Sequence, residues 1–209
     1  MFDLSQFSIS ELTGLIIPAA IFLLFLTYFF IVRPWHLRWG TKDEELRLLM
    51  PGDGEVNQPD FNATRAISIQ AKPEVVWKWI VQMGSNRAGW YSIDWIDNGG
   101  VPSSTEILPE FQKIQKGMFI PFRTNQKNGM WVKDFELNEF ILWKDRDGNA
   151  TCLWYLYPTV DGCRLLVRSR TKYIWKGVKT IYYLLYDVGD IVMMRRCLLG
   201  IKSRAEAMA

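Results

Sequence analysis

Residues 62–98 read NATRAISIQAKPEVVWKWIVQMGSNRAGWYSIDWIDN, and this stretch decides the fold. Its opening residues alternate with a period of two, which predicts a β-strand over 62–70. Pro73 then stands where proline favours a helix start, and Glu74 in the first turn suits the helix dipole. The predicted helix carries one apolar stripe at helical spacing, made of Val76, Trp79, Ile80 and Met83.

The second half of the same stretch predicts a loop and a short second helix. Gly84 ends the first helix, and a polar loop continues to Gly89. The second helix is predicted to start at Trp90 and to close at Asn98-Gly99-Gly100. The predicted order is therefore one strand, two helices and then a long run of strands.

Several short segments carry a resemblance to a known group of proteins: RAISI (65–69), PEVVW (73–77), VQMG (81–84), GWYS (89–92), DW (94–95), ILPEF (107–111), KG (116–117), IP (120–121) and LGIK (199–202). In this order they resemble the START-like superfamily (SRPBCC, with polyketide cyclase and lipid-transfer members), over about residues 33–206. The resemblance implies an α+β helix-grip fold, in which an antiparallel sheet wraps around a long C-terminal helix. It indicates the fold more narrowly than the function, because this superfamily includes carriers, cyclases and binding modules.

The segment Leu12 to Val32 is uncharged and almost wholly apolar, and reads LTGLIIPAAIFLLFLTYFFIV. About 20 such residues at roughly 1.5 Å each span a hydrocarbon core of about 30 Å, so the segment predicts one transmembrane helix. A signal peptide is the rival interpretation. Against it stand the lack of Lys or Arg before the run, the length of the run and the lack of a small-residue cleavage site. A buried hairpin helix fits poorly, because the run is apolar on all sides.

Charges on either side of the apolar run predict its orientation. Arg33, Arg38 and Lys42 follow the run, whereas Asp3 and Glu11 precede it. By the positive-inside rule, the globular domain is expected on the cytoplasmic side of the membrane. The predicted organisation is a short tail over 1–11, a transmembrane helix over 12–32, a juxtamembrane segment and connector over 33–60, and a START-like domain over 61–209.

The predicted connector contains one short helix. Thr41 is the expected N-cap, Glu44 occupies the capping-box position, and Pro51-Gly52-Asp53-Gly54 breaks the helix after Met50. His36 is the only histidine of the chain. We expect it to be a polar interface residue rather than a general base or metal ligand, because it has no partner nearby in the sequence.

The second half of the chain predicts an antiparallel sheet. A short strand ends at Pro121, a polar turn covers 125–129, and four further strands cover 130–136, 140–144, 152–158 and 163–171. Asp161-Gly162 is a strong two-residue hairpin signal.

That hairpin predicts a register between the last two strands. With Val160 opposite Cys163, Leu156 lies opposite Val167, and the pattern makes one face of the hairpin apolar. The other face pairs tyrosines with arginines, as a solvated or headgroup-facing surface would. Cys152 and Cys163 lie far apart in this register, which disfavours a disulfide between them.

A long amphipathic helix is predicted over 176–207, with apolar residues at three- and four-residue steps. Gly189 in its middle costs about 1 kcal/mol relative to alanine unless close packing uses it. Asp187 and Asp190 are expected on its polar surface. The resemblance implies that this helix lies across the concave sheet and that a cavity opens between them.

Composition excludes several classes of function. The chain of 209 residues fits one domain with an appendage, and its net charge of +3, without a basic stripe, does not indicate a nucleic-acid partner. The 3 cysteines show no CxxC spacing, which suits a reducing compartment. No GxSxG, HExxH, P-loop or GxGxxG motif is present, so we expect no metal ion and no cofactor, and an enzyme is not the favoured interpretation.

Two pairs of acids could act as acid and base, Asp94 with Asp97 and Glu106 with Glu110, and Asp94 is the most interesting of them. Aromatic neighbours in the sequence would raise the pKa of a buried carboxyl there, whereas a loop-capping acid is the simpler interpretation. Core packing is the first interpretation of the tryptophans, and a hollow lined by aromatic side chains is the second, because a domain of this size rarely needs so many for packing alone. The predicted ligand-binding residues are Trp90, Tyr91, Asp94, Trp95, Trp131, Trp154, Leu156 and Val167.

Three functions are compatible with these observations. The first is a membrane-tethered domain that binds a hydrophobic small molecule or lipid between the sheet and the C-terminal helix. The second is an enzyme of the cyclase or hydrolase kind that uses Asp94 on a bound apolar substrate. The third is a membrane module with a filled core that recruits a protein partner through the Tyr/Arg face. We rank them in that order.

Overall fold

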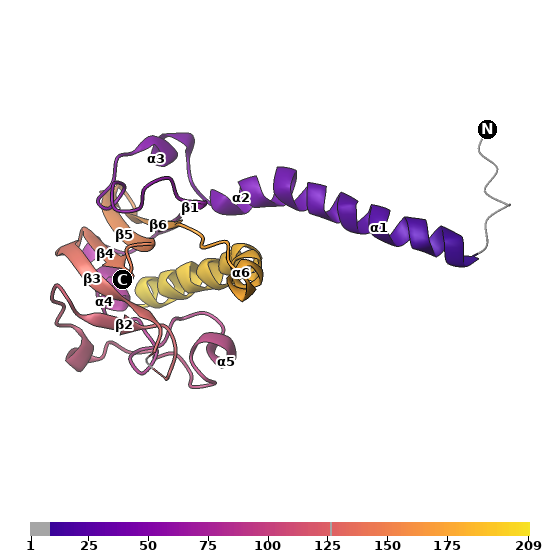
Figure 1. Cartoon of the computed structure of the whole chain (residues 1–209). Helices are drawn as coiled ribbons and strands as arrows, with labels where there is room; N and C mark the ends of the chain where they lie inside the picture. The colour runs from indigo at the N-terminus through magenta and orange to yellow at the C-terminus, as the bar shows by residue number, and fades with distance from the viewer. Residues whose placement is uncertain (1–8, 126) are drawn as a thin grey trace. The chain divides into compact units, whose positions relative to one another are not determined.

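The computed structural model describes residues 9–125 and 127–209, and the chain divides into two compact units, Met1–His36 and Leu37–Ala209 (Figure 1). In the first unit, helix α1 (Ile9–Thr27) continues through a π-helical turn (Tyr28–Val32) into α2 (Arg33–Leu37). Its stretch Thr13–Leu37 is long and apolar enough to cross a membrane, by length and composition. Residues 1–8 of the tail predicted over 1–11 lie outside the described residues. Helix α1 begins at Ile9, within the predicted tail.

The second unit is built on one antiparallel sheet of six strands. The strands are β1 (Phe61–Ile69), β2 (Phe119–Pro121), β3 (Gly129–Glu136), β4 (Phe140–Lys144), β5 (Ala150–Thr159) and β6 (Gly162–Thr171), in the spatial order β1-β6-β5-β4-β3-β2. Helices α4 (Pro73–Val81) and α6 (Val178–Glu206) contact the sheet, and Figure 1 shows α6 lying along its concave side. This is the α+β helix-grip arrangement that the sequence predicts.

Each face of the sheet buries a separate set of side chains. The face that carries Trp154, Leu165 and Ile69 belongs to the main core, together with α4 and the second half of α6, and we call it the inner face. The opposite face carries Ala66, Leu153 and Leu166, which pack against Met50, and we call it the outer face. Both faces of the sheet are therefore covered.

The register of the β5–β6 hairpin differs from the prediction by two residues. Leu156 pairs with Leu165, not with Val167, and the turn residues are Val160 and Asp161. Gly162 has a φ of +143°, and a Cβ there would collide with the carbonyl oxygen of Ile69 in β1. Glycine is therefore required at this position because β1, a strand distant in sequence, approaches it closely. The predicted faces are nevertheless correct, because side chains alternate with a period of two.

The second predicted helix is wrong in its start. Helix α5 spans only Asp94–Asp97, because Tyr91 adopts a φ of +56°, which interrupts any helix that begins at Trp90. The Tyr91 N–H donates to Ser103 Oγ (3.0 Å), and its hydroxyl donates to the carbonyl of Trp79 (3.1 Å). These two bonds hold an uncommon backbone conformation for a bulky residue.

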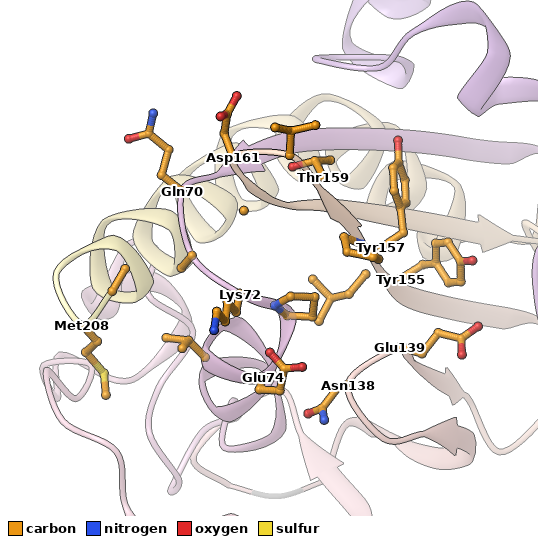
Figure 2. Close-up of a pocket in the computed structure, with 18 of the residues that line it drawn as sticks. Gln70, Lys72, Glu74, Asn138, Glu139, Tyr155, Tyr157, Thr159, Asp161 and Met208 are labelled. Atoms are coloured by element: carbon orange, nitrogen blue, oxygen red, sulfur yellow. The ribbon is translucent and has the colours of Figure 1, made fainter.

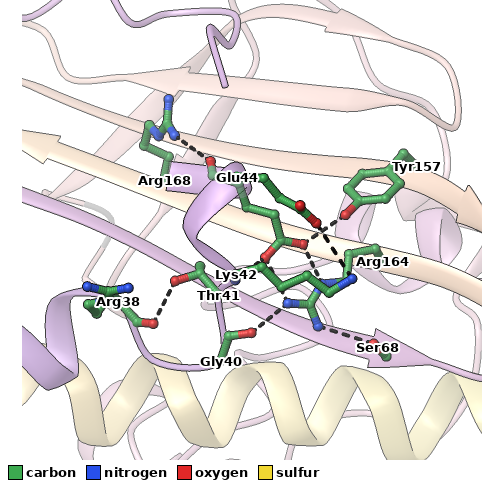
Figure 3. A network of polar contacts seen from close by, with 10 residues as sticks. Arg38, Gly40, Thr41, Lys42, Glu44, Ser68, Tyr157, Arg164 and Arg168 are labelled. Carbon is green, nitrogen blue, oxygen red and sulfur yellow. Dashed lines mark hydrogen bonds and ion pairs between the residues drawn. The ribbon is translucent and has the colours of Figure 1, made fainter. Parts of the chain in front are cut away.

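Residues 37–60 belong to the compact unit, and the part between Glu45 and Val56 covers the outer face of the sheet. Helix α3 (Asp43–Arg47) places Glu45 on Arg164, with a distance of 2.7 Å between Oε1 and Nε, and the Tyr157 hydroxyl donates to the same carboxylate (2.8 Å). Figure 3 shows this network. Further along, Asp53 accepts from Arg168 (2.7 Å). The Tyr/Arg face is therefore buried, and the prediction of a solvated or headgroup-facing surface is wrong.

The start of α3 differs from the prediction by one residue. The N-cap is Lys42, and its N–H donates to the carboxylate of Glu45 (2.7 Å) rather than to Glu44. The hydroxyl of Thr41, the predicted N-cap, donates instead to the carbonyl of Arg38 (2.7 Å).

Helix α6 uses its residues differently from the prediction. Asp187 is buried and Asp190 is nearly so, because both face the sheet rather than solvent. Gly200 lies so close to the loop before α5 that a Cβ would collide with the carbonyl oxygen of Tyr91, whereas a Cβ at Gly189 would meet nothing within 4 Å. Close packing therefore requires only the second of these helical glycines.

Replacing Glu45 tests its ion pair with Arg164 on the outer face. Burial alone raises the pKa of this carboxyl, but the hydrogen bond from Arg164 and the other donors outweigh burial and lower the pKa of Glu45 to about 2. We expect Glu45→Gln to reduce the free energy of unfolding by about 2 kcal/mol at pH 7, as for hydrogen bonds to charged groups.

The pKa of Glu45 in the folded state lies below the ordinary value of 4.5. Its contribution to the free energy of unfolding is therefore complete above pH 4.5 and is lost as the pH falls toward 2. Denaturant titrations of the full chain should show the difference between wild type and variant narrowing over this range. Glu44→Gln, at an exposed neighbouring acid, is the control and should have little effect. A difference that is independent of pH would contradict the assignment.

The two glycines of α6 make a matched pair of substitutions. Gly189→Ala should raise the free energy of unfolding by up to about 1 kcal/mol, because alanine favours the helix and finds open space. Gly200→Ala should lower it, because the added methyl collides with backbone rather than with a flexible side chain. Unfolding measurements that give both variants the same sign would contradict this packing.

Candidate ligand-binding site

Three tryptophans form a connected row on the inner face of the sheet. Trp143 in β4 and Trp154 in β5 lie on the same face of adjacent strands, with ring centroids 5.5 Å apart. Trp90, from the loop before α5, reaches Trp143 with a centroid distance of 6.0 Å. Trp143 and Trp154 are both 2% exposed, so the row lies inside the molecule.

The indole N–H groups of this row differ in their bonding. Trp90 Nε1 donates to Ser85 Oγ (3.3 Å), whereas the buried Nε1 atoms of Trp143 and Trp154 have no hydrogen-bond partner. A buried donor without an acceptor costs about 1–3 kcal/mol relative to a bonded one. A ligand oxygen or a water molecule that accepted from these two groups would remove that cost.

A buried ion pair lies in the same space between the sheet and α6. Arg65 of β1 projects from the inner face and pairs with Asp190 of α6, with side-chain exposures of 1% and 11%. Asp187, one turn earlier, accepts a hydrogen bond from the Tyr173 hydroxyl (3.1 Å). Helix α6 thus presents two carboxylates to a sheet face that is otherwise mostly apolar.

The groups around this ion pair are held in their uncharged forms. Burial raises the pKa of the Cys152 thiol to about 12, and Ser169 Oγ lies 3.7 Å from its sulfur. Burial, followed by the charge of Asp190, raises the pKa of the Tyr186 phenol well above its ordinary value. A protonated thiol is a poor nucleophile, so this environment suits binding better than covalent chemistry.

The predicted ligand-binding residues fall into three places. Trp154, Leu156 and Val167 lie on the inner face, and Trp90 joins them through Trp143. Trp131 lies on the opposite face and packs against Phe119 at a centroid distance of 4.7 Å. The remaining three lie in the loop that contains α5, and they are Tyr91, Asp94 and Trp95.

Of these three residues, only Tyr91 is buried, and its hydroxyl accepts from Gln82 Nε2 (2.9 Å). Trp95 is 76% exposed. The Asp94 carboxylate accepts from the Ser103 N–H (3.0 Å) and from the Ser103 hydroxyl, which closes the loop. Burial, followed by the nearby Asp94, raises the pKa of a different carboxyl, that of Asp97, to about 6.

A separate groove of about 1170 Å³ opens on the surface at the end of the sheet where the β5–β6 hairpin lies. Figure 2 shows its rim, which carries Lys72, Glu74, Glu139 and Asp161. Of the predicted ligand-binding residues, only Leu156 lines it. Charges of both signs on an open rim distinguish this groove from the aromatic row.

Two further predictions concern polar residues. His36 has a partner eight residues away, because the Tyr28 hydroxyl lies 3.1 Å from its Nε2, so the expectation that no partner stands nearby in the sequence is wrong. Cysteines 152, 163 and 197 are free, as predicted for the first two. Among residues 9–125 and 127–209, no cluster of three or more His, Cys, Asp or Glu side chains could hold a metal ion.

Sequence reasoning missed Arg65, Asp190 and Trp143 as members of the site. The signal for Arg65 was present, because it shares the period-two phase of Ile67 and Ile69, the apolar residues of β1. A charge in the buried phase of a strand requires a buried partner. Nothing in the sequence identified that partner, which stands 125 residues later.

Comparison with known proteins returns similarities to solved structures only. No family model matches the chain, and no curated protein matches it. Protein SSP2350 from Staphylococcus saprophyticus is 13% identical, with 71% of this chain and 93% of that chain covered and a TM-score of 0.43. Protein CV1439 from Chromobacterium violaceum is 15% identical, with 69% and 97% covered and a TM-score of 0.44. The Polyketide_cyc-like protein Cgl2372 from Corynebacterium glutamicum is 16% identical, with 70% and 92% covered and a TM-score of 0.39.

Breaking the ion pair on one side tests its role in the site. We expect Asp190→Ala to lower the free energy of unfolding by about 3 kcal/mol, because it leaves the Arg65 guanidinium buried without this carboxylate. Asp147→Ala, at an exposed turn, should change it by no more than about 0.5 kcal/mol.

The double variant Arg65→Met with Asp190→Leu should recover much of the loss, because it removes both charges together. Denaturant unfolding of wild type, the single variants Arg65→Met and Asp190→Leu, and this double variant gives the coupling between the two positions. Additive losses would show that the two side chains do not act as a pair.

Proposed function

We propose that this protein is a membrane-anchored helix-grip domain that binds a hydrophobic small molecule or lipid between the inner face of the sheet and α6. The observation that carries the proposal is the pair of unpartnered, buried indole N–H groups of Trp143 and Trp154. They lie on a mostly apolar surface that also contains the buried Arg65–Asp190 pair. Mostly apolar surroundings with a few directed polar groups are typical of ligand sites.

The chemistry of the site indicates the kind of ligand. Indole N–H groups only donate, so the matching ligand atom is an acceptor such as a carbonyl, ether or hydroxyl oxygen. The aromatic rings provide broad apolar contact around that atom. A largely hydrophobic molecule with at least one oxygen function satisfies both requirements.

The same site gives weaker support to an enzyme. The Asp94 carboxylate, which the enzyme hypothesis would use as an acid or base, already accepts two hydrogen bonds from Ser103. The Cys152 thiol is protonated at neutral pH, because burial raises its pKa to about 12. Binding therefore remains the favoured function.

The anchor in this proposal is the helix over Thr13–Leu37, whose length and apolar composition suit a membrane span. The basic residues Arg33, Arg38 and Lys42 near its C-terminal end favour a cytoplasmic position for the folded domain. An anchor would keep the binding site close to a reservoir of apolar molecules and raise their effective concentration.

Mass spectrometry of an organic extract tests the proposal. The full chain is purified in mild detergent and compared with the double variant Trp143→Phe, Trp154→Phe. The variant keeps aromatic rings at both positions but lacks the two donors. We expect wild type to retain a defined oxygen-bearing apolar molecule, and each lost donor to weaken its binding by about 1 kcal/mol, which is roughly fivefold.

Trp131→Phe is the matched control, because Trp131 lies on the opposite face of the sheet and should leave retention unchanged. Thermal unfolding of all three proteins checks that the substitutions preserve the fold. Identical extracts from the three proteins, or only a mixture that follows the composition of the membrane, would overturn the proposal.

A further inference from the structure

We infer that the outward side of the first half of α6 lies against the surface of a lipid bilayer with anionic headgroups. This inference rests on the membrane anchor proposed above and adds a second contact between the protein and the membrane. The motivating feature is a row of aliphatic side chains that the fold leaves uncovered. The row consists of Val178, Ile181, Leu185, Val188 and Val192, which are 83%, 61%, 69%, 51% and 51% exposed.

These residues follow one another at three- and four-residue steps, so they form a single stripe along α6. The side of α6 that faces the sheet is a different stripe, which includes Asp187, Leu198 and Ile201. The first half of the helix is therefore apolar on a second side, away from the core. A contiguous exposed apolar surface of this kind marks an interaction site.

The charges of this helix favour a membrane over a protein partner. Between positions 172 and 205 the only acids are Asp187 and Asp190, and both turn toward the sheet. Two exposed lysines lie at the start of the stripe, Lys176 and Lys179. Two exposed arginines follow its last residue, Arg195 and Arg196. An apolar stripe with basic residues at both ends and no outward carboxylate matches an anionic headgroup layer.

Aromatic residues add to this pattern at the start of the helix. Trp175 and Tyr182 are 56% and 58% exposed. Tryptophan and tyrosine favour the boundary between headgroups and acyl chains, where a ring is buried and its polar edge stays hydrated. Two such side chains beside the aliphatic row are typical of a helix that lies in the plane of the interface.

The chain enters the compact unit beside this surface. Leu37 is the first residue of the compact unit, and it packs in the same cluster as Tyr183 and Tyr186 of α6. Trp39, two residues later, lies under the guanidinium of Arg195, 5.3 Å from the ring centroid. The compact unit therefore begins beside α6. The residues just after the anchor thus contact the helix for which we infer the lipid contact.

Lipid contact along α6 would also affect ligand exchange. The opposite side of the same helical stretch supplies Asp190 to the ion pair in the candidate site. A helix with lipid on one side and the site on the other would let an apolar molecule move between membrane and protein over a short path.

Site-specific fluorescence in lipid nanodiscs tests the inference on the full chain. Leu185→Cys is labelled with an environment-sensitive nitrobenzoxadiazole probe, and nitroxide groups on the lipid acyl chains act as quenchers. The three native cysteines are buried, so an unsubstituted protein sets the background of labelling. Val160→Cys is the matched control, because this valine is 101% exposed at the β5–β6 turn.

We expect the probe at position 185 to be quenched several-fold more strongly by the labelled lipid than the probe at position 160. Replacing Lys176 and Lys179 by glutamate, or using nanodiscs of neutral lipid, should reduce this difference. Equal quenching at the two positions would overturn the inference. An apolar environment at position 185 without quenching would also overturn it, in favour of a second copy or another segment of the protein on this surface.

A separate observation distinguishes failure of the anchor from failure of the docking surface. If the protein does not enter nanodiscs, or is washed from membranes by alkaline carbonate, the proposed anchor is wrong. If it stays in the membrane while the probe at position 185 remains in water, the anchor holds and only the docking surface is wrong.

Discussion

The buried ion pair between Glu45 and Arg164 is the contact on which the arrangement of this protein depends. Covering an arginine on the outer face of the sheet is unfavourable unless a carboxylate pairs with it. For Arg164 that carboxylate is Glu45, which lies 119 residues away in the sequence. The pair holds the segment from Glu45 to Val56 on the outer face, so the sheet is covered on both sides. The residues that follow the apolar helix are consequently held on the domain instead of forming a flexible connector.

The inner face also buries an arginine beside a carboxylate, in the pair of Arg65 and Asp190. Here the partner comes from α6, and the space around the pair holds tryptophan donors that have no acceptor within the protein. Buried polar atoms without a hydrogen-bond partner occur on both faces of the sheet, and the proposed site beneath α6 rests on those of Trp143 and Trp154. In the two proposals, α6 is the central element, with the site on one side and lipid on the other.

Much of the fold could be predicted because local patterns decide it. The alternation in β1 and β6, Pro73 at the start of α4 and the length of α6 each depend on neighbours in sequence. The errors arise where a distant residue decides. The sequence predicts Gly162 as a turn residue, whereas the structure shows that the close approach of Ile69 requires glycine there. The sequence predicts Tyr91 as helical, whereas its N–H donates to Ser103, which is distant in the sequence. Of the candidate site, Trp90, Trp154 and the inner face could be predicted, whereas Trp143 and the Arg65–Asp190 pair were missed.

By itself, the sequence determined the order of the elements, the helix-grip architecture, which residues share a face of the sheet, and the presence of an apolar helix long enough to span a membrane. The helix-grip architecture followed from the resemblance of short segments to a known superfamily. The other features follow from periodicity, composition and turn residues, which act over a few residues. Only the tertiary structure decided that residues 37–60 bury the arginines of the outer face, and that Asp187 and Asp190 turn inward on α6. It also decided that an aliphatic stripe of α6 stays exposed. The reason is that desolvating a charge is favourable only beside its partner, and partners far apart in sequence meet only in the folded chain.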